Sequence, residues 1–86
     1  MDSRRFSRPV TVTDHARQRM AERNVTEERL LDLIDTGEIR HKDASRLWIA
    51  KHYPERNDNL LCAAVVLEST LVVKTVMHHF SWESQP

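Results

Sequence analysis

The sequence predicts a single α+β domain, in which two N-terminal helices pack on one face of a three- to four-stranded antiparallel sheet. Two stretches in the first half of the chain carry apolar residues at helical spacing, whereas the second half consists of runs rich in β-branched and aromatic residues. Short connections separate these runs, and connections of this length join antiparallel neighbours. A chain of 86 residues has no room for a second core.

The first helix is expected between Thr13 and Asn24. Thr13 or Asp14 can accept hydrogen bonds from the free N–H groups of a first turn, and asparagine tolerates the left-handed conformation that ends many helices. Ala16 and Met20 are the apolar contacts that this helix would bury.

His15, Arg19 and Arg23 recur at every fourth residue, so they form one polar stripe on this helix that borders the buried side. Two arginines at this spacing repel each other, and Glu22 offsets part of that repulsion. A cationic pair beside a histidine at the edge of a core favours binding of an anion.

The second helix is predicted over residues 26–36. Thr26 is a candidate N-cap, acidic residues follow it in the first turn, and the apolar residues come at helical spacing. Gly37, the single glycine of the chain, occupies the position at which a residue in the left-handed conformation ends many helices.

Three or four strands are predicted in the rest of the chain, over residues 38–42 (a candidate short edge strand), 46–53, 60–67 and 71–79, with a strong turn signal at 54–59. In the last of them, alternation predicts that Met77 faces the helices and that Lys74 lies on the opposite, partly open face. His78 and His79 would then point to opposite faces unless a bulge intervenes.

In the second predicted strand, Lys51 and Tyr53 share one face, while Arg46, Trp48 and His52 share the other. The sequence does not determine which of these two faces also carries the lysine of the last strand.

The overall charge argues against a strongly basic nucleic-acid binder, because 13 basic residues balance 13 acidic ones. Residues 1–11 are predicted as a mobile basic arm, residues 12–80 as the domain and residues 81–86 as a C-terminal tail. Cys62 is the single cysteine, which excludes an internal disulfide and suits a reducing cytoplasm. No apolar stretch is long enough for a transmembrane helix, and the N-terminus lacks the apolar segment of a signal peptide.

Several catalytic arrangements lack their signatures in this sequence. The histidines do not follow metal-ligand spacings, so neither a metal nor a cofactor is expected. A nucleophile elbow and a glycine-rich phosphate loop are also missing, and Cys62 lies in a run that reads as buried.

What remains is a set of histidines and cations suited to metal-free cleavage of RNA. In that reaction the 2′-hydroxyl attacks its own phosphodiester, one group accepts its proton, another protonates the leaving 5′-oxygen, and cations stabilise the phosphate. Histidine is the usual proton-transfer group near neutral pH, and arginine binds phosphate in a bidentate manner. The alternative interpretation is that these residues are solvated charges on a helix and at a sheet edge.

The segment from His15 to Glu28 resembles the H-x-x-x-R-M-x-x-R-x-[IV]-[ST]-x-E pattern of a small domain family grouped with the RelE/ParE-like toxins, within the barnase–colicin–RelE class of ribonucleases. The strand at 71–76 is similar to the closing V-x-T-V strand of that family. The resemblance implies a compact α+β fold, action on RNA, in many members on ribosome-bound mRNA, and control by an antitoxin protein. The matching motif positions are His15, Arg19 and Arg23, and His78 stands near the place of the family's last-strand tyrosine or arginine.

The leading hypothesis is therefore a metal-independent endoribonuclease of a toxin–antitoxin type. The residues predicted to be catalytic are His15, Arg19 and His78, and those predicted to bind the substrate are Arg23, Lys74, Arg46, Lys51 and His52. The expected partners are RNA, an antitoxin protein and a second copy of the chain in a homodimer. No association with a membrane is expected.

Two alternatives stay open at this point. One is a non-catalytic interaction module that docks a protein through an open sheet face carrying Trp48 or Tyr53. The other is a nucleic-acid binder that uses Arg4, Arg5 and Arg8, whose affinity would fall steeply with salt.

Overall fold

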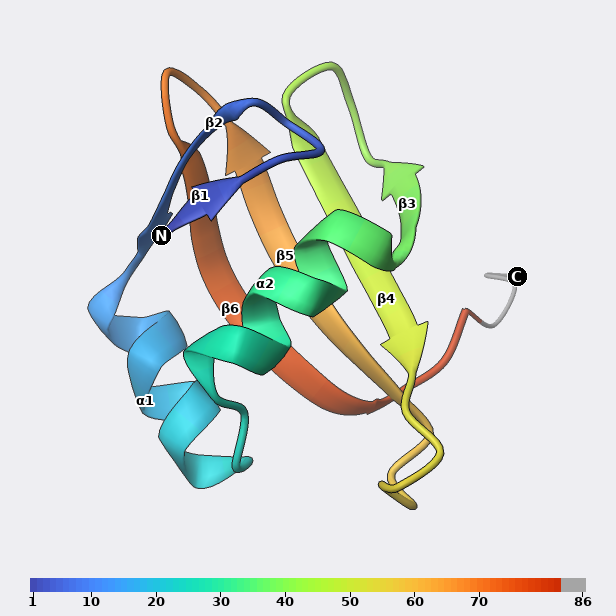
Figure 1. Cartoon of the computed structure of the whole chain (residues 1–86). Coiled ribbons are helices and arrows are strands. Elements are labelled where there is room, and N and C mark those ends of the chain that lie inside the picture. Colours follow the sequence, from blue (N-terminus) through green and yellow to red (C-terminus); the bar gives the residue numbers. More distant parts are fainter. Residues whose placement is uncertain (83–86) are drawn as a thin grey trace.

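The computed structural model describes residues 1–82, and within them the chain forms two helices and one curled sheet of six strands (Figure 1). The elements in chain order are β1 (Asp2–Ser3), β2 (Arg8–Val12), α1 (Asp14–Glu22), α2 (Glu27–Thr36), β3 (Glu38–His41), β4 (Arg46–His52), β5 (Leu60–Leu67) and β6 (Leu71–Phe80). The strand order across the sheet is β1-β2-β6-β5-β4-β3. Most of the predicted C-terminal tail, residues 83–86, lies outside the described part.

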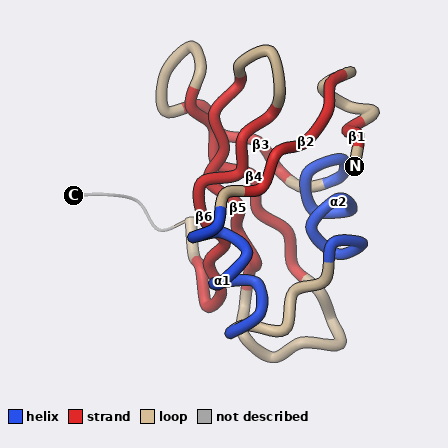
Figure 2. The backbone as a smooth tube through the Cα atoms, turned by 90° about the vertical axis from the view of Figure 1, so that its left-hand side faces the viewer, coloured by secondary structure: helices blue, strands red, loops and turns tan. Residues whose placement is uncertain are grey.

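The predicted three- to four-stranded antiparallel sheet is wrong, because the N-terminal residues add two strands and make the sheet mixed. β2 pairs parallel with β6 through Val10 and Leu71, while β3, β4, β5 and β6 form the antiparallel meander expected from their short connections. The helices also do not lie together on one face. α2 crosses β4 and β5, whereas α1 packs along β6 (Figure 2).

The N-terminal residues are held by the domain rather than forming the mobile arm expected from the sequence. The buried Ser3 donates a hydrogen bond to Asp35 at 2.7 Å. Arg5 donates to the carbonyl oxygens of Ile34 and Gly37, at 3.1 and 2.7 Å, and so caps the C-terminal end of α2. The Arg8 side chain likewise donates to a carbonyl oxygen of the β5–β6 turn. Two of the three arginines expected to bind nucleic acid, Arg5 and Arg8, therefore bind main-chain carbonyl groups instead.

α1 begins and ends as its sequence predicts, and it covers the edge of β6 that β2 leaves free. The Thr13 side chain accepts a hydrogen bond from the Ala16 N–H, and Asn24 adopts a left-handed φ of 55°. Thr13 also donates to the Val73 carbonyl at 3.1 Å, and Arg23 donates to the Val76 carbonyl at 2.6 Å. These contacts satisfy backbone groups at a sheet edge that would otherwise be unpaired.

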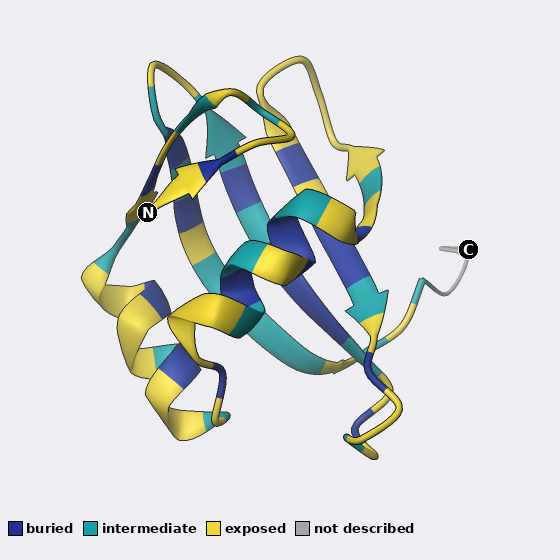
Figure 3. Ribbon diagram, in the orientation of Figure 1, coloured by how far each residue is buried: buried dark blue, intermediate teal, exposed yellow. Residues whose placement is uncertain are grey.

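α2 is capped by Thr26 and buries Leu30, Leu33 and Ile34 against the sheet, as its apolar spacing predicts (Figure 3). Gly37 follows it with φ of −74°, so the predicted left-handed conformation is wrong. Glycine is needed here for close approach, because a Cβ atom would lie 2.6 Å from the Leu33 carbonyl oxygen. Neither helix of residues 1–82 has the length and apolar character that spanning a membrane requires.

Two irregularities in β6 change the faces predicted for its side chains. Ala64 pairs with Thr75 and the next residue of β5 pairs with Val73, which leaves Lys74 as an extra residue. Val73 and Val76 are consequently buried in the core, and Met77, predicted to face the helices, pairs with Cys62 on the other face. The prediction failed because a one-residue insertion inverts the alternation beyond it.

Candidate functional site

The structure distributes the predicted site residues over several places instead of one pocket. They lie at the end of α1 beside β6 (Arg23 and His78), on the sheet face opposite α2 (Lys74, Arg46 and His52), on the side of β4 that faces α2 (Lys51), and on the outer side of α1 (His15 and Arg19). The first of these places brings two predicted residues together with groups that the sequence did not single out.

His15 does not join His78. His15 is exposed in the first turn of α1, and that turn lies beside Val73 through the N-cap contact. Arg23 is eight residues further along, about 12 Å by the rise of an α-helix, and it contacts Val76. The two histidines therefore lie at opposite ends of the α1–β6 contact, and Arg19 between them is paired with Glu22 at 2.7 Å.

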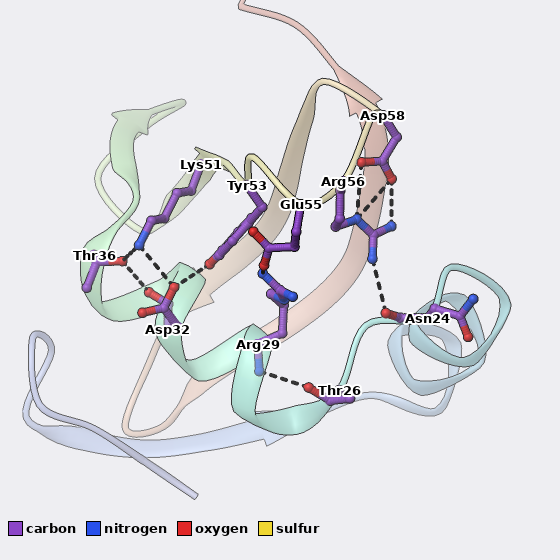
Figure 4. A network of polar contacts seen from close by, with 10 residues as sticks. All are labelled: Asn24, Thr26, Arg29, Asp32, Thr36, Lys51, Tyr53, Glu55, Arg56 and Asp58. Atoms are coloured by element: carbon purple, nitrogen blue, oxygen red, sulfur yellow. Dashed lines mark hydrogen bonds and ion pairs between the residues drawn. The ribbon is translucent and has the colours of Figure 1, made fainter.

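The group at the end of α1, which we call the His78 site, consists of Arg23, Arg56, Asp58, His78 and His79. Its centre is an ion pair between Arg56 and Asp58, with a shortest N–O distance of 2.6 Å (Figure 4). Arg56 also donates to the carbonyl oxygens of Arg23 at 2.9 Å and Asn24 at 3.1 Å. The 53–59 loop is thereby fastened to the C-terminal end of α1.

The two histidines are brought together by the second irregularity of β6. His78 and His79 stand opposite a single residue of β5, between the Met77 and Phe80 pairs, and His79 has a φ of 55°. Their ring centroids are 4.5 Å apart. A bulge is therefore present at the point where the sequence allowed one, and the two imidazoles can serve the same site.

Asp58 holds this pair in place from the loop. Its Oδ2 lies 3.4 Å from His78 Nδ1, and its main-chain carbonyl accepts a hydrogen bond from the His79 N–H at 2.7 Å. Hydrogen bonds from Arg56 lower the pKa of Asp58 to about 2, although burial opposes this shift. Asp58 thus stays a carboxylate at neutral pH, and a carboxylate beside Nδ1 orients the imidazole with its other nitrogen outward.

The surface next to these groups is hollowed and carries two guanidinium groups. The hollow has a volume of about 260 Å³ and is lined by Arg23, Asn24, Glu55, Arg56, Asn57 and Asp58. Arg56 is neutralised by its partner Asp58, whereas Arg23 uses its Nη1 to bind the Val76 carbonyl. The remaining donors of Arg23 supply positive charge to this hollow, which Asp58, the partner of His78, also lines.

Lys51 belongs to a separate network that ties β4 to α2. It binds Asp32 at 3.0 Å and Thr36 at 2.6 Å, and the Tyr53 hydroxyl donates to the same aspartate at 2.5 Å (Figure 4). The hydrogen bond from Tyr53 and, after it, the one from Lys51 lower the pKa of Asp32. Burial and, after it, the hydrogen bond to Asp32 raise the pKa of Tyr53. Tyr53 is therefore a buried structural residue, and of the two aromatic residues proposed for an open face only Trp48 lies on it.

Sequence reasoning missed Arg56 and Asp58, because residues 54–59 were interpreted only as a turn. One available signal was the spacing of apolar residues in the last strand. Val73 and Val76 are separated by three positions rather than two, which indicates an inserted residue in a strand whose core face is apolar. The same reasoning, applied to the adjacent His78 and His79, points to a second bulge.

Two other kinds of chemistry receive no support from the described residues. Within residues 1–82, no group of three or more histidine, cysteine, aspartate or glutamate side chains is arranged to hold a metal ion. Cys62 is fully buried, and burial raises the pKa of its thiol to about 12. A thiol in this state is a core residue and not a nucleophile.

Comparison with known proteins gives one match. Residues 12–78 match a family described as a domain of unknown function, DUF4258. Searches of the curated proteins and of the solved structures found no significant match.

Proposed function

Since the chain belongs to the DUF4258 family of domains of unknown function, we propose its function from the geometry of its own residues: metal-independent cleavage of RNA at the His78 site. The observation that supports this most is the contact between Asp58 and His78 Nδ1, at 3.4 Å, because Asp58 also lines the hollow that carries the guanidinium of Arg23. An imidazole oriented by a carboxylate and placed next to a cation is suited to proton transfer at a phosphodiester.

In the proposed reaction His78 accepts the proton of the RNA 2′-hydroxyl through its outward nitrogen. The 2′-oxygen forms a bond to phosphorus, the bond from phosphorus to the 5′-oxygen breaks, and His79 donates a proton to that leaving oxygen. The products are a 2′,3′-cyclic phosphate and a 5′-hydroxyl. Arg23 stabilises the negative charge that builds up on the phosphate, and Asp58 positions His78 without touching the substrate.

His79 takes the role that the sequence analysis gave to His15. The reason is distance, because the His79 ring centroid lies 4.5 Å from that of His78, whereas His15 is at the far end of α1. Arg19 is likewise left out of the proposed machinery, since its guanidinium is paired with Glu22.

The resemblance to RelE/ParE-like toxins supports RNA as the substrate and adds two proposals. One is an inhibitory antitoxin partner, and the other is location in the cytoplasm, where ribosome-bound mRNA is found. The reduced, buried Cys62 is consistent with that compartment. Growth arrest of bacteria on induced expression, relieved by a His78→Ala change, would support a toxin role; equal growth of the two strains would contradict it.

The direct test is cleavage of an end-labelled RNA by the purified protein in the presence of EDTA. His78→Ala is expected to lower the rate by about 10²- to 10⁴-fold, the usual contribution of a general acid or base. His41→Ala is the matched control, because His41 is exposed on the edge strand β3 and should leave the rate unchanged. Equal rates for wild type and His78→Ala, with both folded by circular dichroism, would refute the proposal.

A further inference from the structure

The face of the sheet opposite α2 carries a small hollow that the His78 site does not use. It has a volume of about 150 Å³ and lies across β4, β5 and β6, where the residues that matter are Lys42, Arg46, Trp48, Ala64, Val66 and Lys74. Trp48 is 40% exposed, which is unusual for the largest apolar side chain in a strand. We call this surface the Trp48 hollow. Figure 2 shows α2 on one side of the sheet, and this hollow is on the other.

The charge of the Trp48 hollow is of one sign. Three of its lining residues are cations and none is acidic. Arg46 is paired with Asp43, but Lys42 and Lys74 are exposed, and no ion pair engages either of them within residues 1–82. Lys74 is the extra residue of the β6 bulge, so it projects out of the strand at this point.

The partly exposed indole of Trp48, whose ring also makes an edge-to-face contact with Phe80, lies in the same hollow as two lysines without an ion-pair partner among the described residues. An aromatic surface beside cations matches the two chemical features of single-stranded nucleic acid. Bases stack on exposed aromatic side chains whatever their sequence, and neighbouring lysines bind the phosphates. The small volume suits one planar group at a time, since pockets for whole small molecules are about 300–1,000 Å³.

A peptide fits this surface less well. β4 and β5 are hydrogen-bonded to neighbours on both sides, so an extended peptide cannot add to the sheet here. An apolar helix would have to bury the unpaired lysines of the hollow, which costs free energy. Charge complementarity therefore favours a polyanion that carries flat groups.

We propose that unpaired RNA binds across the Trp48 hollow, with a base stacked on Trp48 and phosphates held by Lys42 and Lys74. This inference rests on the proposed function and specifies its substrate as single-stranded. Lys74 and His78 lie on the same strand, four residues and about 13 Å apart. An RNA strand that follows β6 reaches from the hollow to the His78 site.

The test measures binding of a fluorescent 2′-O-methyl oligouridine by anisotropy, because this probe lacks the attacking hydroxyl and stays intact. Trp48→Ala is expected to weaken binding by about 5- to 150-fold, whereas Trp48→Phe keeps the stacking surface and most of the affinity. Lys74→Gln is expected to reduce the slope of log K against log salt by about 0.7, while Arg17→Gln, a control on the exposed side of α1, leaves it unchanged.

Three results would overturn the inference. The first is an affinity of Trp48→Ala for the oligouridine equal to that of wild type, and the second is an affinity of wild type for duplex RNA equal to that for the oligouridine. The third is binding of a polyglutamate peptide as tightly as the oligouridine, which would make the hollow a docking surface for acidic proteins. The result is separable from that of the proposed function. If binding depends on Trp48 but ordinary RNA is not cleaved, only the proposal of nuclease activity is refuted. If Trp48→Ala cleaves RNA at the wild-type rate, only the proposal of RNA binding at the Trp48 hollow is refuted.

Discussion

The most quantitative prediction concerns Asp58, whose side chain is only 10% exposed and is bound by Arg56. Its pKa falls from 3.8 to about 2 on folding, a shift that corresponds to about 2 kcal/mol of stability. Because the pKa is lower in the folded protein, this stability is fully present above pH 4 and is lost as the pH falls toward 2. Asp58→Asn removes the titrating group and its charge, so the variant lacks this contribution at every pH.

Urea unfolding followed by circular dichroism measures the effect. At pH 7 the free energy of unfolding should be lower in Asp58→Asn than in wild type by about 2 kcal/mol, and the difference should shrink toward zero near pH 2. The other carboxylates titrate in both proteins, so their contributions cancel in the difference between the two free energies of unfolding. Asp43 has a pKa of about 2 through Arg46 but is exposed, so Asp43→Asn is the control and should change stability less. A difference for Asp58→Asn that is independent of pH would refute the ion-pair reasoning.

Three further predictions concern the fold. Gly37→Ala should lower the free energy of unfolding by about 1–3 kcal/mol, because its Cβ would lie 2.9 Å from the Ala50 carbonyl oxygen; an unchanged urea midpoint would contradict this. Arg5→Ala should destabilise the protein by about 1.5–3 kcal/mol through loss of the α2 cap, and Arg4→Ala much less, so equal thermal midpoints for the two variants would argue against the cap. Cys62 should react with a thiol reagent only in denaturant, and fast labelling of the native protein would contradict its burial.

The local structure of this chain could be predicted well from its sequence. The caps at Thr13 and Thr26 and the left-handed Asn24 are confirmed, and strand β5 has the predicted bounds. These features depend on residues that are close in the sequence, where side-chain chemistry and apolar spacing carry the information.

The sheet could not be predicted in full, because its first two strands depend on distant partners. β2 is five residues long, contains Pro9, and pairs in parallel with residues about 60 positions away. Such a segment has no local signal beyond its β-branched residues, and the arginines at positions 4, 5 and 8 favoured the interpretation as a basic arm. Their actual contacts, to the end of α2 and to the β5–β6 turn, exist only in the folded chain.

The candidate site was predicted in part for the same reason. The sequence identified Arg23 and His78 but joined them to His15, since the helical stripe placed His15 and Arg23 on the same side of the first helix. The actual neighbours of His78 come from a bulge and from the 53–59 loop, through His79 and Asp58. Loop conformations of this kind are fixed by long-range contacts, here between Arg56 and the C-terminal end of α1.

The measurement that tests the central claim most directly is the chemical identity of the RNA ends after incubation with the purified protein in EDTA. Attack by the 2′-hydroxyl, assisted by His78 and His79, predicts 2′,3′-cyclic phosphate and 5′-hydroxyl termini, detected by mass spectrometry and absent with His78→Ala. Intact RNA, or fragments with 3′-hydroxyl and 5′-phosphate ends, would contradict the account.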